Sequence, residues 1–261
     1  MTTTPAGRSH ERSWIPGETL LRNGVARDRS VGDRRLTGEP VSLHGHGSQG
    51  DEAGAGDQLM EPDARVRIGV LALQGDVLEH LRALRRCGAD AVEVRSVNDT
   101  ADIDGLVLPG GESTTIGKLL ARFDLLAPLR AKVAAGLPVF GTCAGMILLS
   151  DELDQQVDQP RIGGLAVRTR RNAFGRQRDS FDTKLDVAGI DGGPMDVAFI
   201  RAPRVEQVLS DDVEVLAEVG GYPVVVAQGD LLACAFHPEV TGDDRLHAWF
   251  VDRVRSVQSR R

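Results

Sequence analysis

The stretch VRIGVLALQGDVLEHLRALRRCG, residues 66–88, combines an expected buried strand with an expected amphipathic helix. Its first eight residues are almost continuously apolar, which is typical of a strand covered on both faces. Val77, Leu81 and Leu84 then recur at helical spacing. Gly88 follows where a helix C-cap is expected. A buried strand followed directly by a helix predicts an α/β fold with a parallel sheet.

Strand and helix patterns continue to alternate as far as residue 143. The next strands expected are AVEVRS (91–96), DGLVLPGG (104–111) and PVFGTC (138–143). A helical stretch that is broken near Pro128 and runs to about Ala135 separates the last two. Consecutive parallel strands are joined by right-handed crossovers, which place helices on both faces of the sheet.

The second half of the chain is richer in strand patterns. A helix over about residues 243–257 follows six runs with strand character: GGLAVRTR, FDTKLDVAG, MDVAFIRA, VEVLAEV, YPVVVAQG and LLACAF. We therefore expect one α/β domain with a mostly parallel central sheet, helices on both faces and an antiparallel β extension in the second half.

The first 65 residues differ in composition from the rest of the chain. They contain none of the seven phenylalanines and none of the three cysteines, and they include tracts such as HGHGSQGDEAGAGDQ (44–58). So little apolar surface cannot offset the entropy cost of ordering. We expect a disordered extension over residues 1–65, a folded domain over 66–257 and a short tail over 258–261. An added docking arm or a start codon assigned too far upstream are the alternatives for the extension.

Charge and cysteine content argue against several functional classes. A net charge of −7 and a pI near 5.4 create no field that attracts nucleic acid or an anionic membrane. The basic run VRTRRNAFGRQR (167–178) is therefore interpreted as a substrate loop with a solvated face. Three cysteines without CxxC spacing predict a reducing, cytoplasmic location, with neither a disulfide framework nor a zinc site. No apolar run reaches the roughly 18–20 residues of a spanning helix.

GTCAG (141–145) has the spacing of a strand–turn–helix elbow with Cys143 at the nucleophile position. Small residues at Gly141 and Gly145 leave room for a sharp turn. The helix expected to begin in MILLS places the sulfur near a helix N-terminus, where negative charge is favoured. The N–H of Ala144 points to the same region and can stabilise an oxyanion. The alternative is that the two glycines only let a strand and a helix pack around a buried cysteine.

A nucleophilic cysteine needs a base, and His80, His237 and His247 are the histidines of the expected domain. His80 and His247 lie within expected helices and are interpreted as surface or packing residues. His237 follows the strand LLACAF, where Pro238 favours an extended conformation at His237. Glu239 stands two residues on, where a carboxylate can orient the imidazole. A turn with a capping acid is the alternative.

The segment LPGGESTTIGK (108–118) places two glycines after an expected strand, as a phosphate-binding loop does. A P-loop would require glycine at position 112, which is Glu112, and serine or threonine at position 119, which is Leu119. The spacing of this segment therefore argues against a nucleotide-binding P-loop. We interpret the segment as an oxyanion or substrate loop beside the cysteine.

Together these motifs carry a resemblance to a known family. Three of them, in this order, resemble the class I (triad) glutamine amidotransferases, which have a flavodoxin-like fold: LPGGEST (108–114), FGTCAG (140–145) and FHPE (236–239). Three others are similar to those of the glutaminase subunits of pyridoxal 5′-phosphate synthases: LALQGDVLEH (71–80), RRNAFGRQRDSF (170–181) and AFIRAP (198–203). The resemblance covers about residues 66–254 and leaves out the first 65.

The resemblance implies roles for individual residues. Cys143 would attack the side-chain amide of L-glutamine, His237 would carry the proton to the departing ammonia, and Glu239 would orient His237. Backbone groups around Gly111 and Ala144 would form the oxyanion hole. The residues implied to contact glutamine are Gly111, Glu112, Ser113, Arg171, Ile200 and Arg201. This chemistry requires no cofactor and no metal.

The resemblance also implies a partner. Ammonia would pass to a separate synthase subunit for pyridoxal 5′-phosphate (vitamin B6) biosynthesis, and the glutaminase would be poorly active until docked. Gln74, in LQGD, is a candidate for the interface side of the oxyanion loop. Three alternatives remain: a glutaminase serving another synthase, a cysteine hydrolase with a similar elbow, or a non-catalytic interaction subunit. The joint presence of Cys143, His237 and Glu239 argues against the last.

Overall fold

The computed structural model describes residues 65–154, 159–171 and 180–261. The disordered extension expected over residues 1–65 lies outside these ranges apart from Arg65, and so does the RNAFG motif after Arg171. None of the helices in the described ranges is long and apolar enough to cross a membrane.

A seven-stranded sheet forms the centre of the domain, in the order β10-β11-β12-β4-β3-β1-β2. Neighbours from β12 to β2 pair in parallel, whereas β10 and β11, and β11 and β12, pair antiparallel. The strands are β1 (Arg67–Leu71), β2 (Asp90–Val94), β3 (Gly105–Leu108), β4 (Val139–Thr142), β10 (Glu214–Val219), β11 (Tyr222–Gln228) and β12 (Leu231–Cys234). The expected parallel sheet with an antiparallel extension is confirmed.

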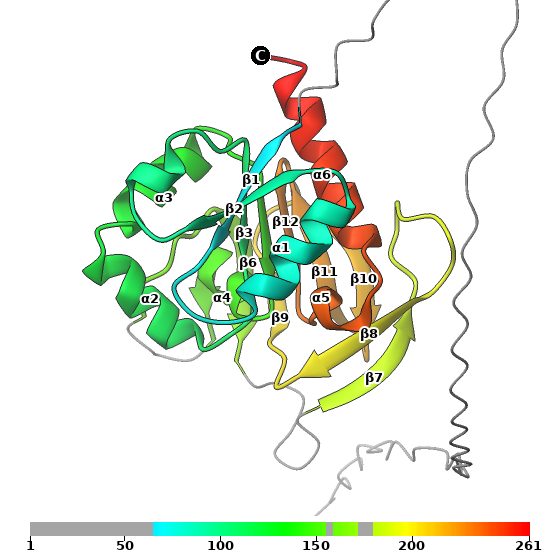
Figure 1. Ribbon diagram of the computed structural model, residues 1–261. Helices are drawn as coiled ribbons and strands as arrows, with labels where there is room; N and C mark the ends of the chain where they lie inside the picture. Colours follow the sequence, from blue (N-terminus) through cyan, green and yellow to red (C-terminus); the bar gives the residue numbers. More distant parts are fainter. Residues whose placement is uncertain (1–64, 155–158, 172–179) are drawn as a thin grey trace, which may run out of the picture. The chain divides into compact units, whose positions relative to one another are not determined.

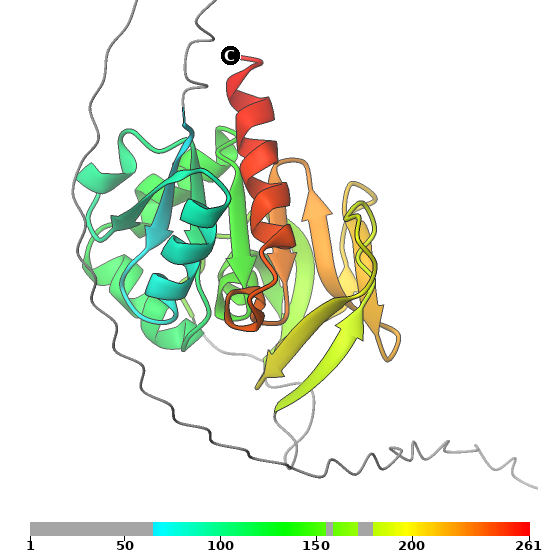
Figure 2. The same ribbon diagram turned by 45° about the vertical axis from the view of Figure 1, so that its right-hand side comes forward.

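Helices cover both faces of this sheet (Figure 1). The helix α1 (Val77–Arg86) packs beside α6 (Arg245–Gln258) on one face, next to the one-turn helix α5 (Pro238–Thr241). The other face carries α2 (Ser113–Arg122), α3 (Leu126–Ala134) and the short α4 (Ala144–Leu149), as Figure 2 shows from the side. A single 3-10 turn, η1 (Asn98–Thr100), follows β2.

The remaining strands form two small sheets. One contains β5 (Ser150–Leu153), β6 (Leu165–Arg170) and β9 (Arg204–Val208). The other is the antiparallel pair of β7 (Ser180–Leu185) and β8 (Met195–Ile200), drawn in yellow tones in Figure 1. The sequence patterns predicted neither β5 nor β9.

Two expected boundaries differ from the structure. The helix expected to break near Pro128 ends earlier, at Arg122, and a new helix begins at Leu126. Pro128 stands in the first turn of this new helix, where its missing N–H costs no hydrogen bond. The helix expected to begin in MILLS begins two residues earlier, at Ala144, and it is short because Ser150 already begins a strand.

The parallel strands bring the expected functional motifs to one edge of the sheet. Gln74 and Asp76 follow β1, Gly111 follows β3, Cys143 follows β4 and His237 follows β12. The carboxyl ends of parallel strands lie at the same edge, where ligands bind in open α/β sheets. The fold therefore gathers residues that are up to 163 positions apart in the chain around one place.

Candidate active site

Cys143 occupies a strained turn between β4 and α4. Its backbone has φ 47° and ψ −102°, a conformation that side-chain-bearing residues rarely adopt. Its N–H donates to the carbonyl oxygen of Cys234 at 2.9 Å, which ties the turn to the neighbouring strand β12. A Cβ on Gly145 would lie 2.0 Å from the carbonyl oxygen of Leu108, and one on Gly141 would lie 2.6 Å from the backbone of Gly145. The expected elbow is present, and the two glycines leave the space that it requires.

His237 and Glu239 lie together directly after β12. The Nδ1 of His237 is 2.8 Å from Oε1 of Glu239, and both side chains are buried. Pro238 begins the short helix α5, and the N–H of His237 donates to the carbonyl oxygen of Ala198 in β8 at 3.1 Å. The carboxylate thus faces the imidazole nitrogen, as expected from FHPE.

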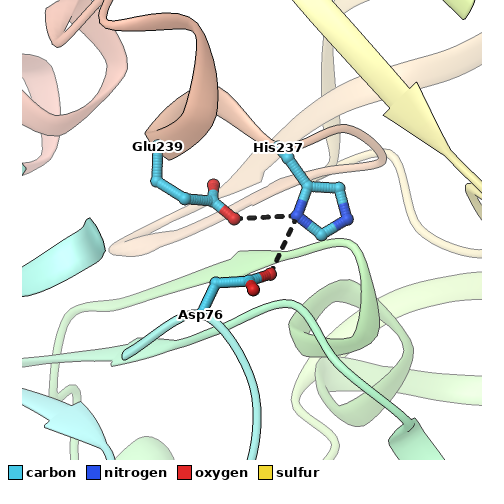
Figure 3. Close-up of side chains that lie close together, drawn as sticks. All are labelled: Asp76, His237 and Glu239. Carbon is cyan, nitrogen blue, oxygen red and sulfur yellow. Dashed lines mark hydrogen bonds and ion pairs between the residues drawn. The ribbon is translucent and has the colours of Figure 1, made fainter. Parts of the chain in front are cut away.

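A second carboxylate contacts the same imidazole nitrogen. Oδ2 of Asp76, in the turn between β1 and α1, lies 3.2 Å from Nδ1 of His237 (Figure 3). Figure 3 also shows Nε2 pointing away from both carboxylates. Asp76 was not among the site residues expected from the sequence. The sequence did offer a signal for it, because Asp76 is an acidic residue that follows a parallel strand at the same sheet edge as His237.

The contacts of His237 control its charge. Burial lowers the pKa of the imidazole, but hydrogen bonds with Asp76, Cys143 and Glu239 outweigh burial and raise this pKa to about 12. Burial raises the pKa of Glu239, and its contact with His237 only partly opposes that effect. At neutral pH His237 is therefore an imidazolium that donates from Nδ1 to these carboxylates.

The glycine loop after β3 lies against both His237 and Gln74. Oε1 of Gln74 accepts a hydrogen bond from the N–H of Glu112 at 2.7 Å. A Cβ on Gly110 would lie 2.3 Å from Cε1 of His237, and one on Gly111 would lie 2.6 Å from Oε1 of Gln74. Gln74 therefore lies beside the glycine loop, as expected.

A cavity of about 390 Å³ opens beside Cys143. It is lined by all of the expected site residues except Glu239, which lies behind His237: Gly111, Glu112, Ser113, Cys143, Ala144, Arg171, Ile200, Arg201 and His237. Gln74, Asp76 and Ile147 complete the lining. The structure thus brings residues of all six motifs together around one space.

An anion and a cation face each other at this cavity. Nη2 of Arg171 lies 2.7 Å from Oε1 of Glu112, and Nη1 of Arg171 donates to Oγ1 of Thr114 at 2.8 Å. Burial raises the pKa of Glu112, but hydrogen bonds from Thr115 and Thr114 outweigh it and lower this pKa to about 2. Glu112 stays ionised, so the cavity offers one group suited to an ammonium and one suited to a carboxylate.

The carboxylates around His237 are also the described groups that could hold a metal ion. One oxygen of Asp76, one oxygen of Glu239 and Nδ1 of His237 all lie within 4.8 Å of one another. Distances of 2.8 and 3.2 Å to Nδ1 are also those of hydrogen bonds from a protonated imidazole. A proton on Nδ1 therefore accounts for this geometry.

The two other histidines of the domain are not surface residues. His80 on α1 and His247 on α6 are both fully buried. The surface alternative is wrong, because the two helices pack together and enclose both rings.

Comparisons with known proteins assign the chain to a family. The model of the SNO glutamine amidotransferase family matches residues 70–256. A Frankia alni protein named "Pyridoxal 5′-phosphate synthase subunit PdxT" is 64% identical over 196 residues, which cover 75% of this chain and 98% of that protein. A Parafrankia protein with the same name is 65% identical over 191 residues, covering 73% and 94%.

Solved structures agree with this assignment. A crystal structure described as a glutamine amidotransferase superposes with a TM-score of 0.68 at 47% identity, covering 72% of this chain and 98% of that one. The structure of PurLQS from Thermotoga maritima shares only the fold, with a TM-score of 0.51 at 18% identity, covering 74% and 99%. From the matched family and the relatives that it covers almost completely, the chain belongs to the SNO glutamine amidotransferase family.

Proposed function

We propose that this protein hydrolyses L-glutamine to glutamate and ammonia, with Cys143 as nucleophile. The observation that carries this proposal is the shared cavity that Cys143, on its strained turn, lines together with the imidazolium of His237. A sulfur beside a cationic imidazole is activated for attack on an amide carbonyl. Such a pair is the minimum that thiol-based amide hydrolysis requires.

The reaction then follows from the positions of the side chains. The sulfur of Cys143 attacks the amide carbon, and the oxyanion is stabilised by backbone N–H groups around Gly111 and Ala144. His237 gives its Nε2 proton to the amide nitrogen, which leaves as ammonia while a thioester remains on Cys143. A water molecule, deprotonated by His237, hydrolyses the thioester and releases glutamate. Glu239 holds the imidazole by Nδ1 throughout.

The charged residues of the cavity account for recognition of an amino-acid substrate. The α-carboxylate of glutamine binds Arg171 or Arg201, and its α-ammonium binds Glu112. Ser113 and Ile200 complete the contacts to the substrate. Arg201 follows β8 with φ 44°, and this strained backbone places it at the cavity.

The ammonia passes to a synthase subunit of a pyridoxal 5′-phosphate synthase in this proposal. The names of the Frankia alni and Parafrankia relatives support such an assembly. Gln74 and the oxyanion loop form the side of the site that faces the partner. The free cysteines Cys87, Cys143 and Cys234 support a reducing, cytoplasmic location.

Ammonia release from glutamine tests the proposal, measured with and without the synthase subunit. We expect Cys143→Ala to abolish release and the synthase to increase it. The control is Cys87→Ala, because Cys87 lies half-buried outside the cavity with its sulfur 3.8 Å from the carbonyl oxygen of Asp244. Release that persists in Cys143→Ala would contradict the nucleophile. Ammonia release that does not change when the synthase is added would contradict the proposed partner.

The division of the chain is tested on the full-length protein by limited proteolysis. We propose residues 1–65 as a disordered extension and residues 66–257 as the glutaminase domain, with 258–261 as a tail. Cleavage is expected within the first 65 residues, leaving a resistant fragment that begins near Val66. Protection of the extension when the synthase is added would identify it as a docking arm.

A further inference from the structure

The second carboxylate oxygen of Glu239 lies in a closed environment. Whereas Oε1 contacts His237, Oε2 is buried and has no hydrogen-bond partner among the residues that the structure describes. Nε2 of His80 faces it at 3.5 Å, and both side chains are fully buried. Burying a carboxylate oxygen without a donor costs free energy. Whether Nε2 of His80 carries a proton therefore affects whether Glu239 stays ionised.

His80 connects this carboxylate to two other elements. Its Nδ1 lies 2.9 Å from Nε2 of His247 on α6, and its Nε2 lies 3.1 Å from Oγ1 of Thr142. Thr142 is the last residue of β4 and directly precedes Cys143. One imidazole thus contacts the strand that carries the nucleophile and faces the carboxylate that orients the base.

Burial determines the charge of this histidine pair. Burial, together with repulsion from His247 and His237, lowers the pKa of His80 well below 6.5. Burial also lowers the pKa of His247, to about 4. Both rings are therefore neutral at physiological pH, and a single proton lies between them.

The position of that proton fixes the tautomer of each ring. If His80 donated from Nδ1, its Nε2 lone pair would face the Glu239 carboxylate, and His247 would keep an unpaired N–H at Nδ1. If His247 donates from Nε2 instead, His80 carries its proton on Nε2 and directs it at Thr142 and Glu239. Nδ1 of His247 is buried and has no partner within the described part of the chain, and an unpaired lone pair there is tolerated better than an unpaired N–H. The second arrangement is the favoured one.

We propose that His80 is a positioning residue, whose Nε2–H, fixed in place by His247, keeps Glu239 ionised and directed at His237. This inference rests on the proposed function, because it gives His80 a role in orienting the base of that reaction. It also has a consequence independent of activity, namely that His80 is the Nε2–H tautomer in the resting protein.

Several ionisable groups surround the cluster of Glu239, His80 and His247, and their charges affect the pH dependence of activity. The ionisable groups that act on Glu239 are His237, Asp76, His80 and Cys234. The groups that act on the two histidines His80 and His247 are Asp244, Arg86 and His237. Burial already raises the pKa of Glu239. Loss of the facing N–H raises it further, so the acid limb of kcat/KM moves to higher pH.

Two substitutions at one position test the role of the N–H. We expect His80→Leu, which has no donor, to lower kcat by roughly three- to tenfold, less than the loss of a full hydrogen bond to a charged group would, because the N···O distance is 3.5 Å. KM for glutamine should stay nearly unchanged, since His80 does not line the cavity. His80→Gln keeps a donor near the position of Nε2 and should recover most of kcat and the acid limb.

A matched control separates positioning from packing. Phe250 on α6 is fully buried, and its ring lies 5.7 Å from that of Phe140, which in turn contacts His247. Phe250→Leu therefore loosens the same helix without removing a polar contact. It should lower the melting temperature but leave the pH profile of kcat/KM unchanged.

Imidazole ¹⁵N chemical shifts of the wild-type protein test the tautomer directly. They should show a neutral His80 protonated at Nε2, and this readout stands even if the glutaminase proposal fails or if His80→Leu does not fold. A His80 protonated at Nδ1 would overturn the inference. A folded His80→Leu variant with the kcat and the acid limb of the wild-type protein would also overturn it. The same holds if His80→Gln loses as much kcat as His80→Leu while the acid limb of kcat/KM does not shift.

Discussion

Replacement of Asp76 by asparagine tests the electrostatic account of His237. Oδ2 of Asp76 lies 3.2 Å from Nδ1, whereas Oε1 of Glu239 lies 2.8 Å from it and is more deeply buried. Asp76→Asn removes one negative charge from the imidazole and keeps the size and shape of the side chain. Since the Asp76 side chain is 42% exposed, we expect the variant to fold.

The expected magnitude follows from this geometry. A hydrogen bond to a charged partner contributes about 1.5–3 kcal/mol, and partial exposure of Asp76 places its contact at or below the lower end. About 1.4 kcal/mol corresponds to one pKa unit, so we expect the pKa of His237 to fall by roughly one unit. Glu239→Gln should lower this pKa further, because its carboxylate is buried.

The sign of the effect on stability follows from linkage. The folded-state pKa of His237 is raised from 6.5 to about 12, so its imidazolium stabilises the fold fully below pH 6.5. That contribution is lost as pH rises through the folded-state pKa. Asp76→Asn therefore lowers the pH at which the stabilisation by the imidazolium is lost. The alkaline limb of kcat/KM should move to lower pH with it.

The assay is an imidazole ¹⁵N titration of His237 up to about pH 11, together with the pH profile of ammonia release in the presence of the synthase. Asp182→Asn, on an exposed position of β7, is the matched control and should shift neither. An unchanged His237 pKa in Asp76→Asn would refute the reasoning, and so would a fall as large as that in Glu239→Gln.

Three further predictions concern the elbow, the substrate and the core. Gly145→Ala should lower both the melting temperature and ammonia release, because its Cβ would lie 2.0 Å from the carbonyl oxygen of Leu108. Arg171→Gln should raise KM for glutamine by about tenfold or more with a smaller effect on kcat, since it removes the cation opposite Glu112. Phe250→Ala should reduce the free energy of unfolding by about 3–5 kcal/mol in urea denaturation, because this ring is fully buried.

Some elements were predictable and others were not, for identifiable reasons. The strands β1, β3, β4 and β12 are continuous apolar runs, because both of their faces are covered by helices or other strands. The strand β9 has five residues, of which only Val205 is buried, so it carries too little apolar pattern to be predicted from the sequence. The strand β5 begins within an apolar segment whose composition also suits a helix, and pairing with β6 decides between the two.

The candidate site divides in the same way. Cys143, His237 and Glu239 belong to short motifs in which turn geometry, chain spacing and chemistry act within five residues. Local sequence is therefore sufficient to suggest a nucleophile, a base and an orienting carboxylate. The glycine loop was likewise identified from its own spacing, which excludes a P-loop.

By itself the sequence determined an α/β fold and suggested which groups react, because periodicity and motif spacing are local properties of the chain. Only the tertiary structure placed Asp76 on the imidazole of His237 and buried His80 against His247, 167 positions away. Such contacts arise where the ends of non-consecutive strands and the faces of two helices meet. No local pattern records which side chains will share that space, since sheet order and helix packing decide it.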